Sequence, residues 1–354
     1  SENWKNDTPP DLVFVDGNGL SDANLVRNGK FLDLTEWYDT ATVYGEDTLI
    51  KDLINTSVIE DFGDGKVYEL PIMNDASGLY YDGAYVRNNN INLPKNYEEL
   101  NTICKNAHTA DSNIYGLTYP GKYASYCLNA LIMPAMAAEL PQSEFNALLK
   151  GNEESVAVIR SAKFKEILQR WRDFCAVEGN LMPGSITQDH INTQTAFLNN
   201  RTLFICNGMW LEGEVKNTIP SDFEMRFINS PFIAASAKET VLIGAKNMAV
   251  ATYGKHPDWA KEFIRFLFRE ENQARLVKGY GFLSGLKNFD YTDIGLTETS
   301  QAVINTIMSC ENKVYRKYNW GTLGDMFNNV VNSLAGQEQT VDEAAEYLVD
   351  YLTA

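Results

Sequence analysis

The chain has 354 residues, of which 44% are hydrophobic, and its 47 acidic and 30 basic residues give a net charge of −17. This length and composition predict a folded protein with two domains or one large one, and they exclude wholesale disorder. The acidic balance argues against a nucleic-acid-binding protein, which carries a basic face, and against attachment to anionic lipid through a basic patch.

Short buried strands and amphipathic helices alternate along the chain. We expect strands at residues 10–17, 66–72, 114–120 and 202–206, and then a strand pair within 239–252. We expect helices at residues 20–28, from 96 onward, and at 164–177, 257–278, 320–334 and 340–352. Asn96 is an expected N-cap, and residues 340–343 form a capping box. The alternation predicts an α/β fold with a mostly parallel sheet.

The five cysteines are sparse and widely spaced, and none belongs to a C-x-x-C pair. They are Cys104, Cys127, Cys175, Cys206 and Cys310. The pattern indicates small buried hydrophobic residues, although it leaves one disulfide open in an oxidising compartment. No apolar stretch reaches the roughly 18–20 residues of a membrane span. The chain begins on polar residues at Ser1, so we expect that any signal sequence has been removed or never existed.

Five segments, in order along the chain, carry the pattern of one known family. They are residues 10–15 with 28–35, residues 65–71 with 78–82 and 93–100, residues 197–210, residues 255–264 and residues 339–345. The third segment ends in Asn-Gly-Met-Trp, and the fourth opens with Lys-His-Pro. Together they resemble the extracellular solute-binding proteins of carbohydrate ABC importers (family 1), which include maltose-binding protein. Relative to that family, roughly the first βα unit is missing at the front of the chain.

The resemblance implies an α/β fold with two lobes, of the periplasmic-binding-protein type II, and a ligand cleft between the lobes. It places lobe 1 at residues 1–72 and 248–306, lobe 2 at residues 77–240 and 313–354, and the hinge crossings at residues 72–77, 241–247 and 307–314. Open α/β sheets bind ligands at the carboxyl ends of their strands, which both lobes present to the cleft. Closure is then a hinge motion that ligand contacts stabilise.

The same resemblance implies a receptor that binds a sugar, expected to be an oligosaccharide, and delivers it to the permease subunits of an ABC importer. It implies no catalysis, no cofactor and no metal, and a protein that acts as a monomer. It also implies an extracellular location, either in a periplasm or at a Gram-positive cell surface as a lipid-anchored lipoprotein.

A sugar ring has apolar C–H faces and a rim of hydroxyls, so its site needs flat aromatic side chains and hydrogen-bonding groups. The resemblance places such residues at the ends of the cleft strands, and Trp210 matches the stacking tryptophan of the family. The other aromatic candidates are Tyr119, Tyr123 and Trp320. The polar candidates are Asp16, Asn18, Asn74, Asp75, Glu212 and Lys246, the last followed by Asn247.

Each candidate has a structural alternative. In the alternative for Trp210, the ring packs in the core of a lobe. In the alternative for Asp16, the carboxylate accepts a hydrogen bond from its own backbone in an Asx-turn. In the alternative for Asn74 and Asp75, their side chains make hydrogen bonds within the hinge and do not contact a ligand. Packing roles are expected outright for Trp37, Tyr97, Trp171 and the stripe that contains Trp259.

Two other functions remain open. A glycoside hydrolase also uses aromatic residues, with two carboxylates about 5–10 Å apart, and the many acidic residues of this chain do not discriminate it from a receptor. The chain contains no H-E-x-x-H, G-x-S-x-G or P-loop motif. The third hypothesis is the same fold with a solute other than a sugar, or with a sensor role.

Overall fold

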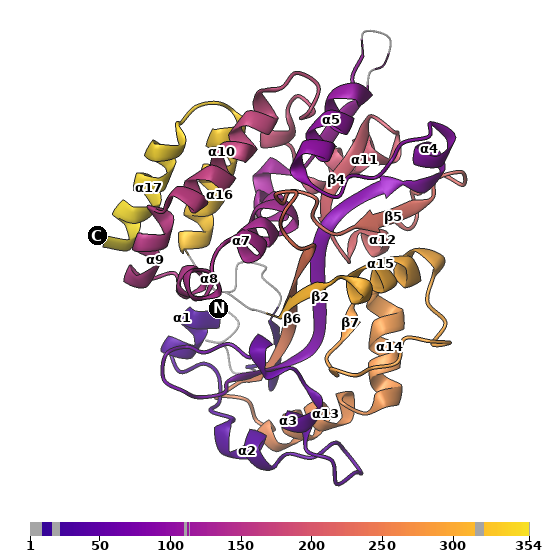
Figure 1. Cartoon of the computed structure of the whole chain (residues 1–354). Coiled ribbons are helices and arrows are strands. Elements are labelled where there is room, and N and C mark those ends of the chain that lie inside the picture. Colours follow the sequence, from indigo (N-terminus) through magenta and orange to yellow (C-terminus); the bar gives the residue numbers. More distant parts are fainter. Residues whose placement is uncertain (1–8, 16–21, 110–111, 113, 316–321, 354) are drawn as a thin grey trace. The chain divides into compact units, whose positions relative to one another are not determined.

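The computed structural model describes residues 9–15, 22–109, 112, 114–315 and 322–353, and Figure 1 labels their helices and strands. These residues form two compact units. Unit 1 contains the chain up to Asp75 and Ile243–Thr297, whereas unit 2 contains Ala76–Leu242, Glu298–Val314 and the chain from Thr322 onward. The chain leaves unit 1 within the long strand β2 (Glu69–Asp82) and returns to it within β6 (Thr240–Val250).

Unit 1 contains the first half of β2 and most of β6, from Ile243 to Val250. Its other elements are β1 (Leu12–Val15), α1 (Asp22–Arg27), α2 (Thr35–Thr40), α3 (Ile50–Leu53), η2 (Thr56–Val58), α13 (Pro257–Leu267), α14 (Glu270–Tyr280) and β7 (Leu283–Ser284). Strand β1 runs antiparallel to β6, with Val15 opposite Asn247, and β7 runs antiparallel to β2, with Leu283 opposite Asn74. Both pairings end at residues of the candidate site.

Unit 2 contains the second half of β2, which lies beside β4 and β5. The strands and short helices are β3 (Tyr115–Thr118), η3 (Gly121–Tyr123), η5 (Ser185–Thr187), β4 (Thr202–Gly208), β5 (Met225–Ile228) and β8 (Asn312–Tyr315). The helices are α4 (Gly83–Asn88), α5 (Tyr97–Ala107), α6 (Ser125–Cys127), the π-helical η4 (Leu128–Ile132), α7 (Met133–Glu139), α8 (Gln142–Lys150), α9 (Glu153–Ile159), α10 (Ala162–Ala176), α11 (His190–Leu198), α12 (Leu211–Val215), α15 (Glu298–Ser309), α16 (Thr322–Ala335) and α17 (Val341–Thr353).

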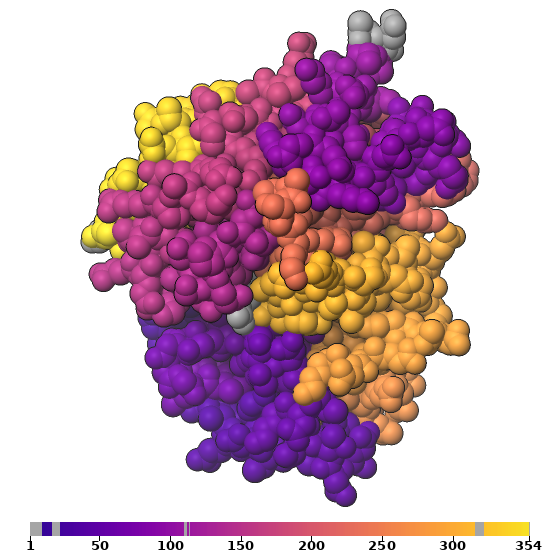
Figure 2. All heavy atoms as spheres, in the orientation of Figure 1, coloured from indigo at the N-terminus to yellow at the C-terminus, as the bar shows by residue number. Residues whose placement is uncertain are grey.

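Helix α10 anchors the helical layer of unit 2. It buries Phe164, Ile167, Leu168 and Trp171, which confirms the face predicted from their spacing. The Trp171 Nε1–H donates to the Val331 carbonyl oxygen over 3.0 Å, so the tryptophan joins α10 to α16. The C-terminal helices pack against the segment around α9 and α10 (Figure 2).

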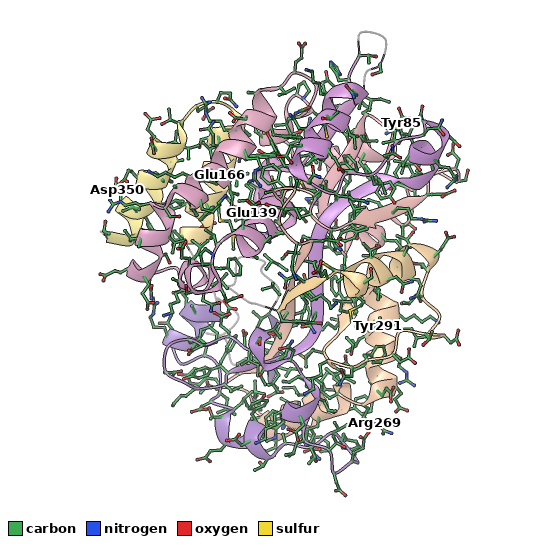
Figure 3. The ribbon with its side chains drawn as sticks, viewed as in Figure 1. Tyr85, Glu139, Glu166, Arg269, Tyr291 and Asp350 are labelled. Atoms are coloured by element: carbon green, nitrogen blue, oxygen red, sulfur yellow. The ribbon has the colours of Figure 1, made fainter. Side chains whose placement is uncertain are left out.

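A buried ion pair joins α10 to α7. The Arg170 guanidinium makes two hydrogen bonds to the Glu139 carboxylate, of 2.6 and 2.9 Å, and also donates to the Phe232 carbonyl oxygen over 3.1 Å. Glu139 in turn accepts the Ala234 N–H over 2.9 Å. Figure 3 labels Glu139 together with Glu166, a more exposed carboxylate that also contacts Arg170. Every charge buried at this junction therefore has a partner.

The predicted helix caps are confirmed. The Asn96 side chain accepts the Glu99 N–H over 3.0 Å, and Thr340 and Glu343 bond each other reciprocally as a capping box. The mostly parallel sheet is wrong for the strand pairs of known direction. Strand β2 is antiparallel to β4, β5 and β7, and only β3 and β4 are parallel in this set. All three antiparallel partners of β2 lie later in the chain and pair with different parts of this long strand.

Two predictions differ from the structure in the number of elements that a segment contains. Residues 239–252 contain one strand, β6, and no strand pair. The helix expected over 257–278 is two helices, because the side-chain amides of Asn272 and Gln273 donate to the Phe266 and Leu267 carbonyl oxygens. These bonds satisfy the end of α13, and α14 begins anew after Arg269.

Residues 298–306 were expected in lobe 1 but belong to unit 2. Helix α15 packs on β5, where Glu298 pairs with Arg226, and the Ser300 hydroxyl donates to Glu212 over 2.6 Å. The packing role expected for Trp259 is also wrong, since this side chain is 76% exposed. Helix α13 instead buries Ala260, Ile264 and Leu267.

The five cysteines are all free, and four of them are buried, as their sparse pattern predicted. Burial raises the pKa values of the Cys104, Cys127 and Cys175 thiols, so these groups stay protonated near neutral pH. We therefore expect the native protein at pH 8 to resist iodoacetamide under conditions that label all five thiols in guanidinium. Intact-mass spectrometry measures the label. Because Cys175 is only half-buried, rapid labelling of more than one thiol in the native protein contradicts the burial.

Candidate functional site

The predicted site residues fall into three sets. Asp16, Asn18 and Trp320 lie outside the described residues. Asn74, Asp75 and Lys246 belong to unit 1, and Tyr119, Tyr123, Trp210 and Glu212 belong to unit 2. Each unit is therefore described by itself.

Trp210 lies two residues after the carboxyl end of β4, at the N-cap position of α12. Its ring lies directly over Gly208, where an added Cβ would come within 2.1 Å of the indole Cζ3 atom. A side chain at position 208 would therefore displace the indole ring from this place. The indole Nε1–H donates to the Tyr126 hydroxyl over 3.2 Å, and the two rings meet edge to face at 5.4 Å. Trp210 is half-buried, so part of its surface remains open to a ligand.

The aromatic contacts continue from Trp210 to a row of four rings. Tyr126 lies 6.5 Å from Tyr123, and Tyr123 lies 5.6 Å from the His190 imidazole, measured between ring centroids. We call Trp210, Tyr126, Tyr123 and His190 the aromatic row. Our reading of the sequence missed Tyr126 and His190. The spacing of Tyr126 three residues after Tyr123, one helical turn, was the available signal for the first, whereas His190 is distant in sequence.

Two predicted residues of unit 2 have structural partners. Tyr119 is fully buried against Trp171, and its hydroxyl donates to Asn332 Oδ1 over 2.8 Å. Burial raises the pKa of this hydroxyl well above its ordinary value. The expected platform role is therefore wrong for Tyr119, since its ring faces the core. Glu212 accepts the Ser300 hydroxyl and so connects α12 to α15.

In unit 1, Asp75 and Lys246 form an ion pair of 3.2 Å in which each side chain is 17% exposed. The ammonium also lies 5.7 Å from the centre of the Phe282 ring. A Cβ at position 244 would stand 3.0 Å from Asp75 Oδ1, so Gly244 leaves room for this carboxylate. The pair presents a donor and an acceptor side by side with no net charge.

Asn74 lies beside this pair in sequence and is 3% exposed. Its Nδ2 donates to the Ser284 carbonyl oxygen over 2.8 Å, which ties β2 to β7. Its Oδ1 is buried and has no hydrogen-bond partner among the described residues. Asn247 donates from Nδ2 to Glu69 Oε1 over 2.6 Å, and its Oδ1 is likewise unsatisfied in the described structure. These two acceptors are among several buried side-chain polar atoms that have no partner in the described structure, so they do not by themselves mark a ligand site.

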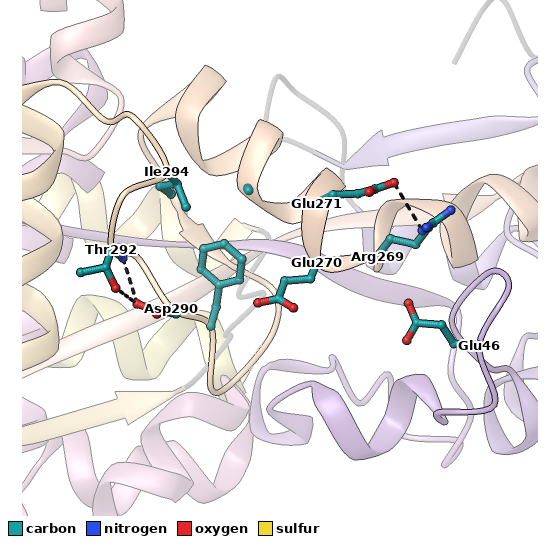
Figure 4. A pocket seen from close by; sticks show the side chains of 9 residues that line it. Glu46, Arg269, Glu270, Glu271, Asp290, Thr292 and Ile294 are labelled. Carbon is teal, nitrogen blue, oxygen red and sulfur yellow. Dashed lines mark hydrogen bonds and ion pairs between the residues drawn. The ribbon is translucent and has the colours of Figure 1, made fainter.

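One hollow of unit 1 does not coincide with these groups. A hollow of about 460 Å³ in unit 1 is lined by Glu46, Arg269, Glu270, Glu271, Ala274, Phe289, Asp290, Thr292 and Ile294 (Figure 4). It contains none of the predicted site residues, and its Arg269 and Asp290 already pair with neighbours. The described part of the chain brings together no three potential metal ligands, and it contains no helix with the length and apolar character of a membrane span.

The fold of the chain agrees with comparisons to known proteins. The chain is 22% identical over 279 residues to YcjN of Escherichia coli (strain K12), which is named as an ABC transporter periplasmic-binding protein. The match covers 72% of this chain, which spans only 59% of the length of YcjN. The structure of maltose-bound T. maritima MalE3 matches with a TM-score of 0.72 at 17% identity, over 98% of this chain and 85% of that one. RafE in complex with raffinose matches with a TM-score of 0.71 at 14% identity, over 97% and 85%.

These structural matches confirm the predicted two-lobe α/β fold. The sequence profile described as bacterial extracellular solute-binding protein matches residues 3–300, which is most of the chain. The chain therefore belongs to the bacterial extracellular solute-binding protein family.

Proposed function

We propose that the chain is the solute receptor of an ABC importer and that it binds a sugar, specifically an oligosaccharide, without turning it over. The aromatic row is the observation that carries this proposal. It offers partly exposed flat rings, which suit the apolar C–H faces of sugar rings, and hydroxyl and imidazole groups at their edges. Maltose in MalE3 and raffinose in RafE, two proteins of the same fold, support a sugar as the solute.

Unit 1 contributes Asn74, Asp75 and Lys246 to the same ligand in this proposal. The buried Asn74 Oδ1 is an acceptor that a sugar hydroxyl satisfies, and the Asp75–Lys246 pair both accepts and donates. Because the charges of the pair cancel, the pair favours a neutral ligand over an acid or an amine. Trp320, Asp16, Asn18 and Glu212 remain further proposed contacts.

The proposal extends to the organisation and partners of the protein. Units 1 and 2 serve as the two lobes, and the passages within β2 and β6 serve as hinge crossings. The receptor acts as a monomer, without cofactor or metal, and passes its ligand to permease subunits. It works in the periplasm or, held by a lipid anchor, at the surface of a Gram-positive cell.

A thermal-shift screen tests the ligand class. We expect one of four series, built from glucose, galactose, xylose or N-acetylglucosamine units, to raise the melting temperature. Ligand at 100 times its Kd stabilises the native state by about 2.7 kcal/mol, because only the folded protein binds it. Peptides, polyamines and divalent metals serve as comparison ligands. A shift with one of these and none with any sugar contradicts the proposed ligand class.

A glycoside hydrolase is the competing function, and product analysis separates it from a receptor. We expect each sugar that shifts the melting temperature to be recovered intact by chromatography after prolonged incubation. Hydrolysis that disappears on replacing a single Asp or Glu overturns the receptor, because two carboxylates drive that reaction.

A further inference from the structure

The aromatic row is longer than one sugar ring requires. Its centroids are separated by 5.4, 6.5 and 5.6 Å in order from Trp210 to His190, which are ordinary contact distances for aromatic pairs. A pyranose ring is about the size of one six-membered aromatic ring, so a single sugar on Trp210 leaves the far end uncovered. Tyr123, in that far end, is 48% exposed.

The backbone holds Tyr123 and His190 together. Tyr123 ends η3, whose Gly121 lies so close to Ile186 that an added Cβ would meet that backbone at 2.2 Å. The Lys122 N–H donates to the Gln188 carbonyl oxygen over 3.1 Å, just before His190 begins α11. The two rings therefore stand on segments that pack against each other, so little ordering is required when a ligand binds.

The far end of the row also has polar groups for a ligand. The indole N–H of Trp210 is bonded to the Tyr126 hydroxyl, whereas the Tyr123 hydroxyl and the His190 ring nitrogens bond no other described residue. A neutral imidazole both donates and accepts, as a sugar hydroxyl does. The nearby Lys122 ammonium and Asp189 carboxylate form an ion pair with 3.8 Å between Nζ and Oδ2, so their charges balance at this end of the row.

We infer that Tyr123 and His190 form a distal subsite for a second sugar unit and that they determine which ligand length is preferred. The inference rests on the proposed function, since it assumes that a first sugar occupies Trp210. Trp210 then binds one unit of any length of ligand, and only longer ligands reach His190. Losing the distal rings weakens the binding of longer ligands selectively.

Isothermal titration of length series tests the subsite. The probes are glucose, maltose and maltotriose; galactose, melibiose and raffinose; xylose, xylobiose and xylotriose; and N-acetylglucosamine with its dimer and trimer. In a series that binds, we expect His190→Ala and Tyr123→Ala each to raise the Kd of the longest bound member about fivefold. The Kd of the shortest bound member changes less than twofold. His190→Phe, which keeps a ring, recovers part of the loss.

Ile191→Ala is the matched control, because Ile191 is the next residue of α11 and is 63% exposed. Equal losses for all lengths, unchanged affinities in both variants, or wild-type binding of a monosaccharide alone overturn the distal subsite while leaving a sugar receptor in place. If the wild-type protein binds no member of any series, the proposed function itself fails, and the subsite fails with it.

Discussion

Trp210→Ala is expected to weaken sugar binding about 30-fold or more. Large aromatic side chains that stack on a ligand contribute about 2 kcal/mol or more on truncation, and about 1.4 kcal/mol corresponds to a factor of ten in Kd. The truncation removes the ring held over Gly208 and also the indole N–H bonded to Tyr126. Titration calorimetry with the sugar that gives the largest thermal shift measures the effect.

Trp259→Ala is the matched control for this variant. Trp259 is also a tryptophan, but it is 76% exposed on α13, so its loss leaves sugar affinity within about twofold and the melting temperature almost unchanged. Trp210→Phe keeps a ring and is expected to retain most of the affinity. If Trp210→Ala and Trp259→Ala bind alike, Trp210 packs in unit 2 without touching ligand.

Arg170→Met is expected to lower the stability of the protein by about 3–5 kcal/mol, the usual cost of leaving a buried charge unpaired. The methionine keeps the apolar stem, but Glu139 loses both of its guanidinium hydrogen bonds and the Phe232 carbonyl loses a donor. At roughly 2–4 °C per kcal/mol for a domain of this size, the melting temperature falls by about 10 °C. Calorimetry of the unliganded protein measures it.

Two comparisons identify the cause of that loss. Arg160 pairs with Glu346 at 2.8 Å in the same unit, but both side chains are about half exposed, so Arg160→Met costs less than about 1 kcal/mol. Adding Glu139→Met to Arg170→Met is expected to restore part of the stability, because it removes a buried carboxylate that has lost its guanidinium and keeps only the more distant Lys163 ammonium, at 4.0 Å. A double variant that is less stable than Arg170→Met alone contradicts the electrostatic cause.

Local signals along the chain predicted local structure well. Asn96 and the Thr340 capping box hold their helix ends because a side-chain oxygen and its N–H target lie within one turn. The stripe of α10 reached the core because its period matches the helix. The α13–α14 break was missed, since the capping amides of Asn272 and Gln273 look like ordinary polar residues in a sequence.

The candidate site also contains residues that the sequence indicates and residues whose environment only the structure shows. Trp210 was proposed because it follows a buried strand and matches the stacking tryptophan of the family that the chain resembles, and its role in binding stays a prediction. Tyr119 and Tyr123 flank one Pro-Gly turn and look equivalent, yet one packs on Trp171 and the other is half-exposed. Side chains on the two sides of a turn point in different directions, and what each contacts depends on distant residues such as Asn332.

By itself, the sequence determined the α/β class, the family, the helix caps and the burial of four of the five cysteines. These features follow from periodicity, short spacing and ordered motifs, whose causes lie within a few residues of each other. The tertiary structure alone decided the strand directions, the place of α15 and the fate of each tyrosine. It also brought His190 to Tyr123 and Lys246 to Asp75. Such pairs are distant in sequence, and only the packing of whole elements brings them into contact.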